Sequence, residues 1–284
     1  MNPRFPTAKR MRRWVFLMLV ATPVGAQQVA DPTFRPPIEN PAYSVGKGPV
    51  VLIDEAHNNF HTSTGRYLPF AELLRRDGFI VTASAARLSA ETLKAARVLV
   101  MANAVASLTT EEVAAVRDWV AGGGSLFLIA DHAPFDVAAT DLGKAFGIRF
   151  SGGVARDPND STGRLMFRRA DGTLMDHWIT KAINEVATFA GTSFQVDARG
   201  QPLLVFGSQV YSFREQKDPN SVSIEGHLQG AVIPFGRGKV AVFGEAAMFS
   251  AQITGPDRHP MGMNAPIAKQ NALFLLNVMH WLTQ

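Results

Sequence analysis

Residues 50–66 read VVLIDEAHNNFHTSTGR, an apolar run that changes within three residues to acids, imidazoles and amides. The apolar part is typical of a strand buried on both faces, as the strands of parallel sheets are. Apolar residues at helical spacing follow at Phe70, Leu73 and Leu74, so the stretch predicts the first half of a βα unit. Ligands of open α/β sheets bind just beyond the carboxyl ends of the strands, and we therefore expect a site in this loop.

Further strands and helices alternate along the next hundred residues. We expect strands at 79–82, 98–102 and 125–130, and a helix that begins at Thr109, which has capping-box spacing to Glu112. Two more strands are expected at 231–235 and 239–243, and a last helix from about Ile267. This alternation predicts an α/β fold with a flavodoxin-like, mostly parallel sheet flanked by helices.

The middle of the chain has a different pattern. Residues 150–229 contain short alternating segments, with hairpin signals at 170–172 and 198–200. They predict an antiparallel β insertion that extends or caps one edge of the sheet. Together the segments indicate a single α/β domain over residues 49–284.

The first residues have the composition of a secretory signal. Five basic residues precede a short apolar run from Trp14 to Val20, and Val24-Gly25-Ala26 supplies small residues at a cleavage site. We expect a signal peptide at 1–26, an extended Pro- and Gly-rich leader at 27–48, and a periplasmic or secreted protein. The alternative is an uncleaved anchor, although the run is short for a bilayer. No later segment is long and apolar enough to span a membrane after cleavage.

Composition excludes several classes of function. The 28 Lys and Arg residues outnumber 24 Asp and Glu, but five of the basic residues leave with the signal peptide, so the mature chain is nearly neutral and no nucleic-acid partner is expected. There is no cysteine, and therefore no disulfide, zinc–thiolate site or cysteine nucleophile. No Walker loop or dinucleotide fingerprint follows a strand, so no nucleotide cofactor is expected.

Several segments fit a known family. They are the strand at 50–54, the strand that follows Gly123-Gly124 and ends in Asp131-His132, the segment 176–180, the segment 236–245, and a terminal helix with Asn277 and Trp281. Together they resemble uncharacterised bacterial domains of the class I glutamine amidotransferase-like superfamily, which includes trehalose-utilisation-type domains and the N-terminal domain of an intraflagellar-transport protein. In true amidotransferases a cysteine nucleophile follows a central strand. Here that turn carries Asp131-His132, so glutamine hydrolysis by that route is excluded.

Polar residues follow several of the expected strands, and parallel strands would bring them to one edge. The resulting hypothesis of acid–base hydrolysis uses Glu55, His57, Asp131 and His132 as catalytic residues. His57, His61, Asp131 and His132 are also candidate ligands for a divalent metal. The structural alternative is that these side chains only cap helices and pin loops.

A second group is expected to bind the ligand: Asp54, Asn58, Asn59, His61, Arg66 and Glu245. Arg66 is suited to clamp a carboxylate, such as that of a uronic acid, and Phe60 and Tyr67 are suited to stack on a sugar. The sequence thus favours a hydrolase that acts on a carbohydrate or another small envelope substrate. The alternative is a non-catalytic ligand-binding or scaffold domain of the cell envelope.

Overall fold

A computed structural model describes residues 28–214 and 220–284. The signal peptide expected at 1–26 lies outside these ranges. The described part of the leader contains one two-residue strand, β1 (Val29–Ala30), and otherwise turns and irregular backbone. None of the described helices is long and apolar enough to cross a membrane.

Five parallel strands form one half of the main sheet, in the spatial order β3-β2-β4-β5-β15. Their bounds are β2 (Val50–Asp54), β3 (Ile80–Ser84), β4 (Val98–Ala102), β5 (Ser125–Ile129) and β15 (Gly238–Phe243). Each of the expected parallel strands is present within two residues of its predicted bounds. β2, β4, β5 and β15 form because each is rich in Val, Leu, Ile or Phe and is buried on both faces, whereas β3 is an edge strand with exposed residues.

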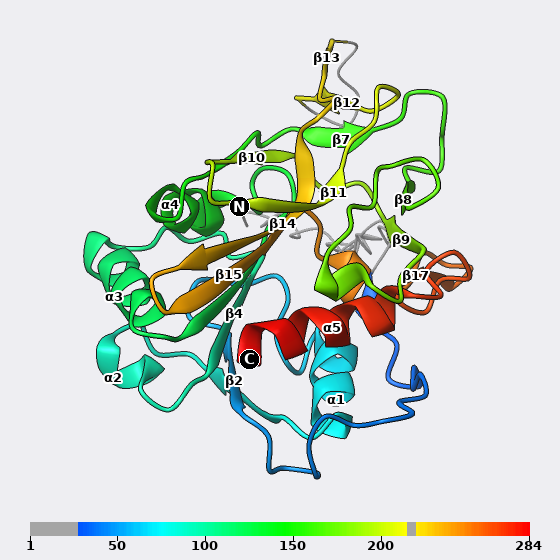
Figure 1. The fold of residues 1–284 in the computed structure, drawn as a ribbon. Coiled ribbons are helices and arrows are strands. Elements are labelled where there is room, and N and C mark those ends of the chain that lie inside the picture. Colours follow the sequence, from blue (N-terminus) through cyan, green and yellow to red (C-terminus); the bar gives the residue numbers. More distant parts are fainter. Residues whose placement is uncertain (1–27, 215–219) are drawn as a thin grey trace, which may run out of the picture.

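The other half of the sheet is antiparallel (Figure 1). It contains β14 (Leu228–Phe235), β10 (Phe194–Val196), β6 (Ile148–Phe150) and β11 (Gln201–Val205). Since four of the nine strands in the described sheet are antiparallel, the protein has a mixed sheet.

The prediction of two hairpins in the insertion is wrong, although both turns exist. The chain turns at Gly172 and at Gly200, but the strands on either side do not pair with each other. β10 and β11 both pair with β14, and β8 (Leu165–Arg168) pairs with β9 (Glu185–Thr188). Local turn chemistry therefore identified the turns, while the pairing of β10 and β11 was decided by the long edge that β14 offers and that of β8 by β9.

Smaller sheets surround the main one. β7 (Val154–Arg156), β12 (Tyr211–Phe213) and β13 (Ser221–Ser223) form one of them, and β1, β16 (Ala251–Thr254) and β17 (His259–Gly262) form another. Two short 3-10 turns, η1 (Trp178–Thr180) and η2 (Ala247–Phe249), complete the β-rich part.

Helices cover both faces of the sheet (Figure 1). Their bounds are α1 (Leu68–Arg76), α2 (Ala90–Leu93), α3 (Thr110–Ala121), α4 (Val137–Ala145) and α5 (Asn271–Thr283). The predicted capping box is confirmed, because the Thr109 side chain accepts from the Glu112 amide and the Glu112 side chain accepts from the Thr109 amide. α5 begins four residues later than predicted.

Alternate residues of the strands supply two separate cores. Ile53 and Phe127 pack with α1 and α5 on one face, whereas Leu52 and Leu126 pack with α2, α3 and α4 on the other. This alternation follows from the two-residue period of a strand. It holds the parallel strands in register and fixes the positions of their carboxyl ends.

Candidate functional site

The carboxyl ends of the parallel strands carry polar residues at one edge of the sheet. Asp54 ends β2, Asn103 follows β4, Asp131 follows β5 and Glu245 follows β15. Because these strands are parallel and adjacent, their ends meet at the same edge. The loops that follow the strands then decide which side chains face one another.

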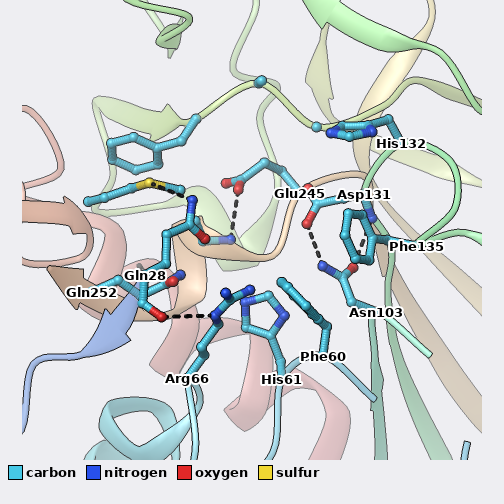
Figure 2. Close-up of a pocket in the computed structure, with 15 residues that line it drawn as sticks. Gln28, Phe60, His61, Arg66, Asn103, Asp131, His132, Phe135, Glu245 and Gln252 are labelled. Carbon is cyan, nitrogen blue, oxygen red and sulfur yellow. Dashed lines mark hydrogen bonds between the residues drawn. The ribbon is translucent and has the colours of Figure 1, made fainter. Parts of the chain in front are cut away.

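A pocket of about 140 Å³ lies at this edge (Figure 2). Its polar lining consists of Gln28, His61, Arg66, Asn103, Asp131, His132, Glu245 and Gln252. Its apolar lining comes from Phe60, Phe135, Met261 and the segment 189–191, together with Ala247. In Figure 2, Arg66, His61 and Phe60 approach from one side, and Glu245 and Asp131 approach from the opposite side.

Asp131 is positioned by Asn103 through two hydrogen bonds. The Asn103 Nδ2 donates to Oδ2 of Asp131 at 2.5 Å, and the Asp131 amide donates to Oδ1 of Asn103 at 2.9 Å. Burial raises the pKa of Asp131 above its ordinary value, against the opposing hydrogen bond from Asn103 and the charges of His132 and Arg66. A carboxyl group with a raised pKa in a pocket is suited to proton transfer near neutral pH.

Glu245 is a second carboxyl group and is only 1 % exposed. Burial, and the negative charge of Asp131, raise the pKa of Glu245 to about 8. The opposing contribution comes from backbone N–H groups, including those of Ala247 and Met248, which each donate to one of its oxygens at 2.7 Å. Two carboxyl groups that share one site cannot easily both ionise, so the pair holds a proton at neutral pH.

Three further side chains line the pocket with buried polar atoms. These atoms have no hydrogen-bond partner among residues 28–214 and 220–284. They are Nδ1 and Nε2 of His61, Nη1 of Arg66, and Oε1 and Nε2 of Gln252. Buried polar groups are nearly always paired, so each exception calls for an explanation, such as a catalytic role or a bound water or ion. The unpaired atoms therefore make this pocket the candidate binding site.

The same side chains are held in place by aromatic and backbone contacts. The Arg66 guanidinium carbon lies 3.7 Å from the Phe60 ring centroid, and its Nε donates to the Gln28 carbonyl oxygen at 3.2 Å. The His61 ring centroid lies 4.7 Å from that of Tyr67. Burial, and the charge of Arg66, lower the pKa of His61 to about 3, so this imidazole is neutral and offers one donor and one acceptor.

The structure separates the residues predicted from sequence into two groups. His61, Arg66, Asp131, His132 and Glu245 line the pocket. The others lie outside its lining: Asp54, Glu55, His57, Asn58 and Asn59. Glu55 accepts a hydrogen bond from the Ser63 amide at 2.7 Å, and Asn58 is an exposed residue with a φ of +53°. The four catalytic candidates are therefore not assembled in one pocket, because the loop after β2 directs its first polar residues into local bonds.

His57 lies between two carboxylates. Its Nδ1 is 3.0 Å from both oxygens of Asp54, and its Nε2 is 3.0 Å from Oε1 of Glu112. Asn59 donates to Asp54, and Arg87 donates to Glu112. The hydrogen bond to Asp54 raises the pKa of His57 despite the opposing effect of burial. An imidazole with a carboxylate at each nitrogen fits the protonated form, which makes His57 a structural cation.

Metal binding is not supported by the positions of these side chains. Within the part of the chain that the structure describes, no three His, Asp or Glu side chains are arranged to hold a metal ion. The candidate ligands His57, His61, Asp131 and His132 are divided, since His57 is bonded to Asp54 and Glu112.

Several pocket residues were missed by sequence reasoning. Asn103 follows an expected strand, and its position after β4 was a usable signal. Gln252 lies in β16 and is fully buried, and the segment 189–191 has no signal other than a glycine. These residues come from elements whose pairing the sequence pattern does not reveal.

Comparisons with known proteins agree on the fold. The solved structure of the "mmIFT52 N-terminal domain" matches with a TM-score of 0.64 and 16 % identity, over 82 % of this chain and 97 % of that one. "Cytoplasmic Protein STM1381" from Salmonella typhimurium LT2 matches with a TM-score of 0.53 and 14 % identity, over 83 % and 99 %. At these identities the likeness concerns the fold alone.

The family comparison is more direct. A search of curated proteins gives no match, but a family model matches residues 67–252, which include most of the sheet and most pocket residues. That model is described as a domain of unknown function, DUF4350. The chain therefore belongs to the DUF4350 family.

Proposed function

We propose that the pocket binds a small hydroxyl-rich molecule, such as one unit of a carbohydrate, and that the protein is a hydrolase acting on it. One observation carries the proposal: unpaired buried polar atoms of His61, Arg66 and Gln252 surround a pocket that also contains two carboxyl groups with raised pKa values. Hydroxyl groups both donate and accept, and so do the neutral imidazole and the amide.

The size and lining of the pocket agree with such a ligand. A cavity of about 150 Å³ holds one benzene ring, so a pocket of similar volume has room for the ring atoms of one sugar unit. The rings of Phe60 and Phe135, whose centroids are 4.8 Å apart, supply apolar surface beside the polar groups. An aromatic surface next to fixed polar groups is a common arrangement in small-molecule sites.

Asp131 and Glu245 have the properties of an acid–base pair. Ionised Asp131 takes a proton from a water molecule, whose oxygen forms a bond to the substrate carbon. The bond from that carbon to the leaving oxygen breaks, and the leaving oxygen keeps the electron pair and takes the proton held by Glu245. The cycle closes when the proton on Asp131 passes to Glu245.

A non-catalytic binding role is the second candidate, and one observation favours it. Each oxygen of Glu245 accepts a backbone N–H at 2.7 Å, so the carboxyl group is held by the protein itself. A fixed, fully bonded carboxyl group is suited to shaping a pocket. Binding without turnover would identify this role.

We infer that the domain is flavodoxin-like and related to the class I glutamine amidotransferase-like superfamily. The strand order β3-β2-β4-β5-β15 and the match to the mmIFT52 N-terminal domain support the inference. The reaction differs from that of the amidotransferases, because the chain has no cysteine nucleophile.

The proposed ligand site predicts a strong effect of Arg66. Arg66→Ala removes the unpaired Nη1 donor, and we expect affinity for the best-bound sugar of a monosaccharide panel to fall about 10- to 100-fold, as for a hydrogen bond from a charged group. Isothermal titration calorimetry measures it. Arg75→Ala is the matched control, because Arg75 pairs with Glu72 on the surface of α1. Equal loss of affinity in both variants would contradict the proposal.

Export is proposed from residues 1–26. We expect the protein expressed with its own N-terminus to accumulate in the periplasm or medium and to begin at Gln27, because the small residues before it suit signal peptidase. N-terminal sequencing after cell fractionation measures this. A chain that starts at Met1 and stays in the cytoplasm would refute export.

A further inference from the structure

We propose that the ligand is at least two units long and that a second pocket, the outer pocket, binds the unit next to its end. The inference rests on the proposed function and extends it from a single sugar to an oligosaccharide. The outer pocket has a volume of about 390 Å³ and is lined by Thr162, Arg164, Thr254, His259 and Pro260, among others.

The two pockets are neighbours that share walls. Phe189, Ala190 and Met261 line both of them. The inner pocket, with about 140 Å³, has room for one ring. A chain whose terminal unit occupies the inner pocket and passes this shared wall would therefore place its second unit in the outer pocket.

The backbone of the shared wall is held in a strained conformation. Ala190 has a φ of +80°, which is unfavourable for a residue with a Cβ, and Gly191 follows at +85°. The Ala190 carbonyl oxygen accepts a hydrogen bond from Gln229 Nε2 at 2.6 Å, and the Thr192 amide donates to the Gly244 carbonyl oxygen at 2.6 Å. Such strain persists where the surroundings enforce it, and it concentrates at ligand sites.

The chemistry of the outer pocket suits a hydroxylated unit. Two threonine hydroxyls, a guanidinium and an imidazole supply donors and acceptors, and Phe189 supplies a ring. The charges are partly balanced by neighbours, because His259 lies 3.7 Å from Asp257 and Arg164 interacts with Asp160. The outer pocket therefore favours hydroxyl groups and tolerates a carboxylate.

The arrangement implies that the ligand is bound by its end. The inner pocket lies against the buried Glu245 and Gln252, so a chain that occupies both pockets would end there. If the bond between the two units is the one hydrolysed, the enzyme releases terminal units one at a time.

The test is calorimetry with three series of linked sugars of one to four units: cello-oligosaccharides, chito-oligosaccharides and oligogalacturonates. We expect the two-unit sugar of at least one series to bind about tenfold or more tightly than its monomer. Arg164→Ala should reduce this gain to about threefold or less and leave monomer affinity unchanged. Thr254→Trp, which fills the outer pocket, should do the same, so one unfolded variant does not prevent the test.

The control is Arg168→Ala, because Arg168 is exposed and lines neither pocket. If monomers bind in an Arg66-dependent way but two units bind no better in any series, the outer pocket is overturned and the proposed function stands. The outer pocket is also overturned if Arg164→Ala and Thr254→Trp both bind the two-unit sugar as much more tightly than the monomer as the wild type does. If no sugar of any length binds, both proposals are overturned.

Discussion

Asp131→Asn is expected to lower kcat by about 10²- to 10⁴-fold for any glycoside that the protein hydrolyses, because it removes the general base. The hydrogen bonds of residue 131 are largely kept, because the amide oxygen of the new side chain can still accept a hydrogen bond from Asn103. We therefore expect KM to change much less than kcat. Initial rates with a panel of nitrophenyl glycosides, followed by the natural oligosaccharide series, measure the effect.

The matched control for Asp131→Asn is Asp136→Asn. Asp136 is the residue before α4, and burial also raises its pKa, but it does not line the pocket. Its replacement should leave kcat within about twofold of the wild type. Turnover that survives Asp131→Asn unchanged would refute Asp131 as the general base, whereas binding without any turnover by the wild type would leave the binding role.

The pH profile gives a second readout of the same pair. With a pKa of about 8, Glu245 holds its proton at neutral pH and loses it at higher pH. The kcat of the wild type should therefore decline above about pH 8 as the general acid ionises. Rates from pH 5 to 10 would show this decline, and a flat alkaline limb would exclude Glu245 as the acid.

His57→Ala is expected to lower the free energy of unfolding by about 3–5 kcal/mol, as for the loss of one partner from a buried ion pair. His57 is 2 % exposed and lies 3.0 Å from carboxylates on both sides, so its removal leaves Asp54 and Glu112 without their shared cation. Urea unfolding followed by circular dichroism measures the loss. A change below about 1 kcal/mol would mean that the network does not stabilise the fold.

The control is His280→Ala. His280 is 26 % exposed at its side chain and bonds a single carboxylate, Asp77, at 2.6 Å. Asp77 keeps the Ala42 amide as a partner, as Asp54 and Glu112 keep Asn59 and Arg87, so the two variants differ in the number of carboxylates that lose the imidazole. We expect the loss of stability to be clearly smaller than for His57→Ala.

The network around His57 also predicts a dependence of stability on pH. The pKa of His57 is raised above its unfolded value of 6.5, so its contribution is complete below about pH 6.5 and is lost as pH rises through the folded-state pKa. The pKa of Glu112 is lowered from 4.5 by hydrogen bonds that outweigh burial, so its contribution is complete above about pH 4.5 and is lost on acidification. The wild type should be most stable between these values, and His57→Gln should reduce the alkaline decline.

Much of the fold was predictable because its elements have strong local patterns. The run at 50–53 and the capping box at Thr109 and Glu112 are properties of a few consecutive residues, and they led to correct elements. The pairing of β10 and β11 with β14 was not predictable, because it depends on an edge formed by residues thirty positions away. The same applies to Gln252, which reaches the pocket only through the small sheet of β1, β16 and β17.

By itself, the sequence determined the parallel strands, the polar character of their carboxyl ends, and the absence of cysteine chemistry. Only the tertiary structure decided which polar side chains reach the pocket. His57 and His61 lie four residues apart, yet they have different surroundings. His57 is bonded to Glu112, fifty-five residues away, whereas His61 lines the pocket and its nitrogens have no hydrogen-bond partner among the described residues. The physical reason is that a side chain leaving a strand end takes its direction from loop backbone and from distant partners, and neither is encoded in residue type and spacing.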